Sequence, residues 1–254
     1  MTKTQLRATL LLVVLALPFC SMAKGPGILS RFQLGFTFPS NQAEYTSSAK
    51  ISVVELDTTY KATQMKTSAA WGFTAGTAFM LKRIGNASSL CLSVDYMYNM
   101  MTWKGDVPGG LASESAYTFD GATVQMALPV GLDLKFGGEA TTIPHPRVCA
   151  TVGAGIYPSY AMTTLTGAPL TFDPAFSVAP YLKAEVGFRA GLCMKVRMLY
   201  AIGDVKYLDF SKTDNSLGEN YSKAALTGKS NMAISLLIMP FSYKWKTEEW
   251  WNTF

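Results

Sequence analysis

The clearest pattern in the chain is a strict alternation of apolar and polar positions across residues 122–136. Even-numbered positions from Val124 to Phe136 are apolar, and the odd-numbered positions between them are small, polar or proline. Successive side chains of a β-strand point to opposite faces, so this period of two predicts a strand. The segment is long enough to cross a bilayer as a tilted strand.

The same two-faced pattern recurs in seven other segments, which brings the expected number of strands to eight. Their apolar positions fall on one face and their Gly, Ser, Thr, Cys or charged positions on the other. The last segment is apolar on both faces near its middle, so its facing stays open. These segments are 32–38, 71–81, 90–100, 148–156, 182–188, 192–202 and 231–245.

Eight strands are enough for a soluble barrel with an apolar interior or for a membrane barrel with an apolar exterior. The polar face favours the second, because a water-exposed face is normally rich in Lys and Glu, whereas here it holds mostly small residues and a few charges. Trp and Tyr on the apolar face suit the membrane interfaces. We therefore predict an all-β, eight-stranded antiparallel up-and-down transmembrane β-barrel.

The expected connections alternate in length, as they do in membrane barrels with short periplasmic turns and long external loops. Segments 39–68, 104–121, 161–177 and 206–230 are long, and segments 82–89, 137–146 and 190–191 are short. Within the first long segment, residues 51–60 are apolar and β-branched enough to form an extra hairpin or to lengthen a neighbouring strand. An ordered loop is the alternative.

The N-terminus has the pattern of an export signal. Lys3 and Arg7 precede an apolar run at 10–19, and small residues end at Ala23. We expect 1–23 to be a cleaved signal peptide and 24–254 a single outer-membrane barrel domain, with 246–254 as a periplasmic tail. A lipoprotein anchored at Cys20 is disfavoured by the bulky Phe19. The expected location is the bacterial outer membrane, with its lipid and the barrel-assembly machinery as partners.

Composition agrees with this class of protein. The 254 residues are 49% hydrophobic and only 15% charged, against roughly 25% charged in soluble domains. Without Lys3 and Arg7, the chain has 20 basic and 17 acidic residues. This excess is too small to indicate nucleic-acid binding.

Three segments resemble the PorT-type "outer membrane protein β-barrel" family of Bacteroidota. They are VQMALPVGLDLKFGG at 124–138, VCATVGAGIY at 148–157 and LCMKVRMLYAIG at 192–203. Pro129 and Lys135 carry most of the likeness, which spans about 31–245. The chain departs from the family at Val130-Gly131 and in its C-terminal tail. The resemblance implies the fold and an outer-membrane location, and it assigns no activity.

A short turn at 190–192 predicts a luminal charge network. A three-residue loop places inward Arg189 opposite inward Cys193, which in turn pairs Glu185 with Arg197. We expect a Glu185–Arg197 ion pair flanked by Lys183 and Lys195, with two further charges, Asp133 and Lys135, on another part of the wall. The network is either a pore lining or, as we favour, a satisfied plug of the narrow lumen.

Cysteine and histidine suggest little chemistry. Cys91, Cys149 and Cys193 are expected to face inward on alternate strands, about 9–10 Å apart, and therefore to be free thiols. A soft-metal site with His145 is the alternative. His145 is the only histidine and lies between two prolines in an expected periplasmic turn. We expect no histidine-dependent catalysis, no cofactor and no bound metal.

These patterns lead to three functional hypotheses. The first is a non-enzymatic outer-membrane barrel with a plugged polar lumen that acts as an anchor, a scaffold or a loop-presenting surface protein. An unidentified protein would then bind its external loops. The second is a narrow pore or an accessory of transport or secretion. The third is a secreted, soluble, lipocalin-like carrier of an apolar ligand.

Overall fold

The computed structural model describes residues 31–51, 56–107, 117–141, 148–165, 174–214 and 220–242. The expected signal peptide, the C-terminal tail, Cys20, His145 and Trp245 lie outside the described residues. The described part includes no helix that is long and apolar enough to cross a lipid bilayer.

Almost every described residue belongs to one antiparallel β-sheet. The strands are β1 (Gln33–Ile51), β2 (Leu56–Ile84), β3 (Ser88–Val107), β4 (Tyr117–Ala127), β5 (Val130–Gly137), β6 (Val148–Leu165), β7 (Ala175–Ala190), β8 (Leu192–Ala201), β9 (Val205–Asp214) and β10 (Asn220–Met239). One short helix, α2 (Gly138–Thr141), connects β5 to β6.

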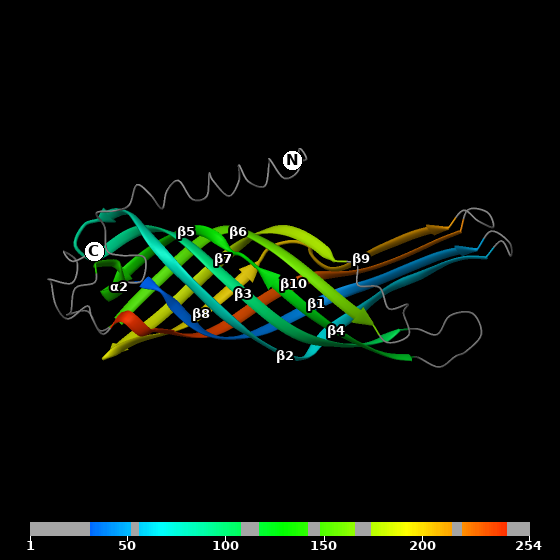
Figure 1. Cartoon of the computed structure of the whole chain (residues 1–254), viewed down its shortest axis with the longest axis horizontal. Coiled ribbons are helices and arrows are strands. Elements are labelled where there is room, and N and C mark those ends of the chain that lie inside the picture. Colours follow the sequence, from blue (N-terminus) through cyan, green and yellow to red (C-terminus); the bar gives the residue numbers. More distant parts are fainter. Residues whose placement is uncertain are drawn as a thin grey trace, which may run out of the picture.

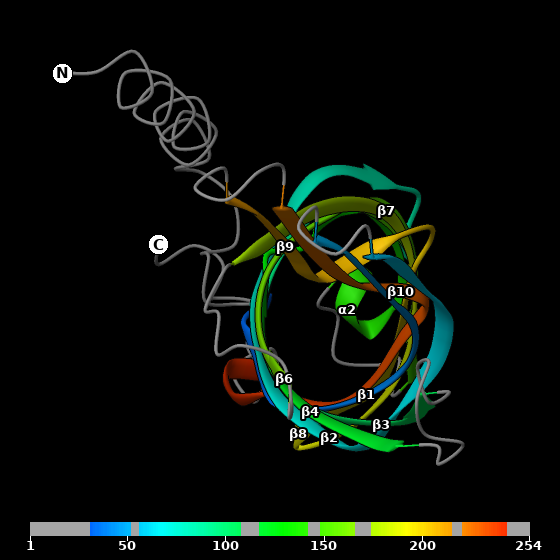
Figure 2. The ribbon, with the colours of Figure 1, turned by 90° about the vertical axis from the view of Figure 1, so that its right-hand side faces the viewer.

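The sheet closes on itself because β1 pairs with both β2 and β10. β4 and β5 continue one another along β3 and β6, and β8 and β9 continue one another along β10. The described wall therefore has eight antiparallel positions, seen end-on as a ring in Figure 2. This confirms the predicted eight-stranded up-and-down barrel.

The wall position formed by β4 and β5 is interrupted at Leu128-Pro129, in the middle of the segment that we expected to be one strand. Proline has no N–H to donate to the ladder. The Asp95 N–H donates to the Pro129 carbonyl at 2.9 Å, and the Leu128 N–H donates to the Pro158 carbonyl at 2.9 Å. The hydrogen bonds around the proline therefore keep the wall closed.

Two expected long loops are largely strands. Most of segment 39–68 lies in β1 and β2, and most of segment 206–230 lies in β9 and β10. Together these strands form a four-stranded extension in the order β2–β1–β10–β9 that projects well beyond the ring (Figure 1). At 51–60 the expected lengthening of neighbouring strands is confirmed, since β1 reaches Ile51 and β2 begins at Leu56. Alternation of apolar residues misses the rest of these segments because backbone pairing does not require an apolar face.

The last strand also differs from its expected bounds. β10 runs from Asn220 to Met239 and is followed by a short turn at 240–242. Its pairing with β1 and β8 settles the facing that the sequence left open. Ser235 and Leu237 are buried in the interior, whereas Leu236 and Ile238 are exposed on the outside.

The outer face of the barrel is a continuous apolar band. Large side chains such as Phe36 and Val186 are each 64% exposed. On β3, for example, every outward position from Leu90 to Met100 is apolar or tyrosine, and this stretch is as long as the roughly 9–11 residues that cross a bilayer. Among the described outward positions of this band none is charged, so the exterior suits lipid.

Candidate functional site: the closed lumen

The interior charge network is built on the hairpin of β7 and β8. Gly191 turns the chain with a φ of +85°, and the register then pairs Gly187 with Lys195 and Glu185 with Arg197. Arg197 Nε donates to Glu185 Oε1 at 2.6 Å, and Lys195 Nζ donates to Glu185 Oε2 at 2.9 Å. The structure thus brings together the two residues that the turn length placed opposite one another.

Asp133 and Lys135 lie on β5 and belong to the same network as the charges of β7 and β8. Lys183 Nζ lies 2.8 Å from Asp133 Oδ2, and Lys135 Nζ lies 4.0 Å from Glu185 Oε2. β5 is a different part of the wall from β7 and β8, and its long side chains reach their charges because an eight-stranded lumen is narrow.

Sequence reasoning missed three charged residues at this site. The Asp95 carboxylate forms ion pairs with Lys183 at 3.4 Å and with Arg197 at 3.2 Å. Glu139 contacts Lys195 at 3.1 Å, and Arg31 donates to the carbonyl oxygens of α2 at 3.2 and 3.4 Å. The inward facing of Asp95 and Arg31 was readable from the alternation. Glu139 carried no such signal, because it lies in the connection after β5.

Helix α2 folds back into the barrel instead of remaining outside it as a turn. Figure 2 shows α2 within the ring, and its residues Glu139 and Ala140 are fully buried. The Glu139 carboxylate also pairs with Lys135. Burial by itself would raise the pKa of this carboxyl, but the ammonium groups of Lys135 and Lys195 outweigh burial and lower its pKa to about 2.

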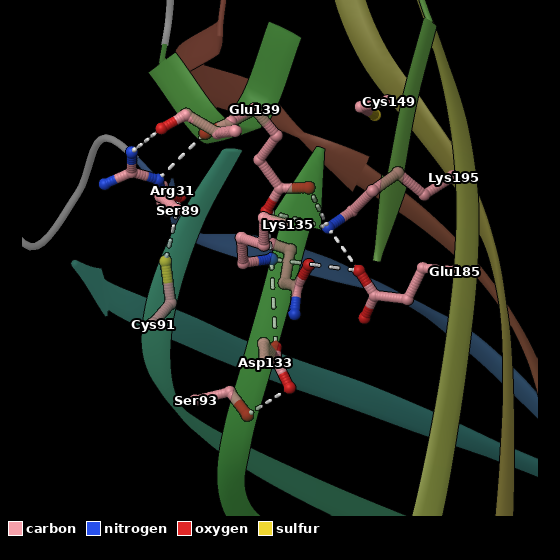
Figure 3. A network of polar contacts seen from close by, with 12 residues as sticks. Arg31, Ser89, Cys91, Ser93, Asp133, Lys135, Glu139, Cys149, Glu185 and Lys195 are labelled. Atoms are coloured by element: carbon pink, nitrogen blue, oxygen red, sulfur yellow. Dashed lines mark hydrogen bonds and ion pairs between the residues drawn. The ribbon is translucent and has the colours of Figure 1, made fainter. Parts of the chain in front are cut away.

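The assembled network is electrically balanced. Ten ion pairs of 4.0 Å or less join eight side chains that are each no more than 1% exposed. Figure 3 shows how Lys135 and Lys195 reach carboxylates from different elements. Buried charges are tolerated only when they are paired in this way. The members are Asp95, Asp133, Lys135, Glu139, Lys183, Glu185, Lys195 and Arg197.

A second layer, which we call the apolar cap, fills the lumen on the side of the four-stranded extension. Beyond Gly203, which has a φ of +90°, β9 places Tyr207 in the interior, where its ring packs on Trp103 with centroids 5.0 Å apart. Asn41 Nδ2 donates to the Tyr207 hydroxyl at 2.9 Å. Methionine side chains at 65, 97 and 101 complete this layer.

The three described cysteines are free thiols and all are buried, but they are not equally separated. Cys149 Sγ and Cys193 Sγ lie only 3.7 Å apart, although β7 runs between their strands. Cys91 instead lies 3.6 Å from the Ser89 hydroxyl. The expected separation of 9–10 Å concerned the strands and did not take into account how far the side chains reach across an intervening glycine.

The described residues contain no cluster of three or more His, Cys, Asp or Glu side chains arranged to hold a metal ion. The carboxylates near the lumen centre are all committed to ion pairs and fully enclosed. No carboxylate of the network is exposed to solvent.

An apolar exterior around a paired, enclosed interior defines the class of protein: a transmembrane β-barrel with a filled lumen. The fold is similar to that of the outer membrane protease OmpT from Escherichia coli, with a TM-score of 0.44 and 7% identity over 82% of this chain and 96% of that chain. It is also similar to Ail, the attachment invasion locus protein of Yersinia pestis, with a TM-score of 0.31 and 12% identity over 78% of this chain and 98% of that chain. For Neisserial surface protein A the TM-score is 0.23, with 13% identity over 80% of this chain and 97% of that chain.

Because these TM-scores are below 0.5, the similarities do not indicate an activity or a partner of this protein. No family model matches the sequence, and no curated protein matches it. The resemblance to the PorT-type family therefore stays a prediction.

Proposed function

We propose that this protein is a non-enzymatic, non-conducting barrel of the bacterial outer membrane that anchors and presents the β2–β1–β10–β9 extension outside the cell. An uncharged apolar band around the wall supports the membrane location. The same outward facing argues against a soluble carrier, whose apolar side chains would point inward. The unidentified protein partner, if the extension binds one, would meet that four-stranded sheet.

The single observation that carries the proposal is that the lumen is filled by two different layers in series. The charge network occupies the half near α2, and the apolar cap occupies the half near the extension. An ion entering from either end would have to break buried ion pairs and also cross an aromatic and methionine layer. Either step alone is costly in a narrow, water-poor interior.

Conductance across a planar bilayer tests closure. The refolded wild-type barrel should show no discrete openings. Removal of the cap alone, with Trp103→Ala and Tyr207→Ala, should leave the bilayer silent because the network still blocks the lumen. Discrete openings should appear only when Glu139→Ala and Lys195→Ala are added to that variant. Openings of the wild type would overturn the closed-lumen proposal and favour the narrow pore.

Epitope tags test the orientation. A tag inserted between Ile51, which ends β1, and Leu56, which begins β2, should bind antibody on intact cells. A matched tag in the short turn after Gly85 should bind antibody only after the outer membrane is permeabilised. The reverse result, or equal labelling of both tags on intact cells, would overturn the proposed presentation of the extension.

A further inference from the structure

The side chains of two cysteines and one methionine pack together in the interior, beside the charge network. Cys149, Cys193 and Met239 form a separate buried group, which we call the sulfur cluster. Met239 on β10 is the direct cross-strand partner of Cys193 on β8. Cys149 comes from β6, so three wall positions contribute one sulfur each. All three residues are at most 4% exposed.

The glycine on the intervening strand makes this meeting possible. Cys149 pairs with Gly187 of β7, and Gly187 pairs with Lys195 of β8. A Cβ atom at position 187 would lie 2.6 Å from Cys149 Sγ and 2.6 Å from Lys195 Cγ. The absence of a side chain at Gly187 therefore lets the Cys149 thiol cross β7 and reach the Cys193 thiol.

The distance between the two thiols suits a shared metal ion. A sulfur–metal bond of about 2.3 Å allows two sulfurs of one ion to be at most about 4.6 Å apart. Sulfurs at such a bond length and 3.7 Å apart subtend an angle of about 107° at the ion. A disulfide, in contrast, needs a sulfur–sulfur bond of about 2.05 Å and strands drawn closer than two strand spacings allow.

We propose that the sulfur cluster binds one soft monovalent metal ion, Cu(I), through the Cys149 and Cys193 thiolates and the Met239 thioether. Thiolate and thioether ligands select Cu(I), whereas a thioether is a poor ligand for Zn²⁺ or harder ions. Binding replaces two S–H bonds with two sulfur–metal bonds and releases two protons to solvent. The metal is already Cu(I) when it binds, so no electron transfer is involved.

The charge network adjoins the sulfur cluster through Lys195, which also pairs with Glu139 and Glu185. Two thiolates and one Cu(I) leave a net charge of −1, and the next inward residue after Cys193 is Lys195, whose side chain runs beside Cys149. A cation adjacent to a buried anionic group compensates part of its desolvation cost. Cys91 is not a member of the sulfur cluster, and its thiol lies 3.6 Å from the Ser89 hydroxyl.

Competition against a chromophoric Cu(I) chelator under reducing conditions tests the proposal on the whole folded barrel. The wild type should take up one Cu(I) per chain. Cys149→Ser and Cys193→Ser should each weaken the affinity at least tenfold, and Met239→Leu should weaken it several-fold. Cys91→Ser is the matched control and should retain wild-type affinity. Heat-modifiable migration in gels verifies that each variant is folded.

Two results would overturn the inference. One is equal Cu(I) uptake by the wild type and the Cys149→Ser/Cys193→Ser double variant. The other is a mass measurement on protein isolated from the cell envelope in which Cys149 and Cys193 are joined as a disulfide and react with alkylating agents only after reduction. The variant Gly187→Ala keeps all three sulfur atoms. Because its added methyl group should push the two thiols apart, we expect it to lower the Cu(I) affinity.

Discussion

Arg197 illustrates how each buried charge in the lumen depends on several partners. Its guanidinium lies 2.6 Å from Glu185 and 3.2 Å from Asp95, and the whole residue is buried. In such surroundings the desolvation cost of one ion is offset only by all its neighbours together. The contribution of a single residue is therefore best measured by removing it alone and then together with a partner.

The costs of removing Arg197 and of removing its partner Glu185 should not be additive. Arg197→Met leaves Glu185 and Asp95 short of a cation and should lower the free energy of unfolding by about 3–5 kcal/mol. Addition of Glu185→Gln should cost less than the sum of the two single changes. Urea-induced unfolding from lipid vesicles measures these values.

An exposed ion pair provides the matched control for Arg197. Lys206 Nζ lies 2.7 Å from Asp209 Oδ2, but both side chains are about half exposed. Lys206→Met should therefore change the free energy of unfolding by less than about 1 kcal/mol. A loss as small as this for Arg197→Met would show that the luminal charges are not enclosed.

Protonation of Glu139 should loosen α2 only in strong acid. Its pKa falls from 4.5 in the unfolded chain to about 2 in the fold, since Lys135 and Lys195 outweigh the effect of burial. A lowered pKa stabilises the fold above pH 4.5, and that contribution disappears as the pH falls through 2. The stability difference between wild type and Glu139→Gln should thus be constant from pH 7 to 5 and shrink towards pH 2. A difference that vanishes by pH 4 would contradict this prediction.

At the scale of the elements, two glycines face each other across the ladder between β5 and β6. Gly131 pairs with Gly155, and Gly155 pairs with Tyr181 of β7. A Cβ atom at Gly155 would run into the backbone of Val130 and Gly131. This approach also leaves room for the Tyr181 hydroxyl beside Gly131.

Gly155→Ala should therefore destabilise the barrel by about 1–3 kcal/mol, the typical cost of overpacking. Ala154→Val, one residue earlier, adds two methyl groups on the outward face and should change stability by less than about 0.5 kcal/mol. Unfolding in urea, followed by tryptophan fluorescence, compares the two variants. Equal losses would indicate that the wall is not closely packed between β5 and β6.

For the molecule as a whole, the decisive property is that the apolar surface faces outward. In a soluble fold such a surface would drive aggregation, whereas in a bilayer it is matched by lipid. The wall of the barrel then separates the charged side chains of the interior from the lipid. The two environments are separated by one layer of backbone.

The free-energy cost of a charge introduced on the outer face should depend on how deep its position lies in the bilayer. Leu182→Arg, in the middle of β7, should lower the free energy of unfolding from vesicles by about 2–4 kcal/mol. Ala190→Arg faces the same way beside the Gly191 turn and should cost about 0–1 kcal/mol. Equal costs at the two positions would mean that the outer face of β7 does not cross the hydrocarbon layer.

The sequence by itself determined the strands of the wall, which side chains face inward, and the pairing of Glu185 with Arg197. All of these are local properties: side chains alternate with a period of two, and a short turn around Gly191 sets the register of the two strands that it joins.

The tertiary structure decided which side chains meet across the lumen. It joined Asp133 and Lys135 to the network, folded Glu139 inside, bent β9 into the cap and brought Cys149 to Cys193. These contacts depend on how the sheet closes and how wide the ring is, and neither is encoded in the spacing of residues along one strand.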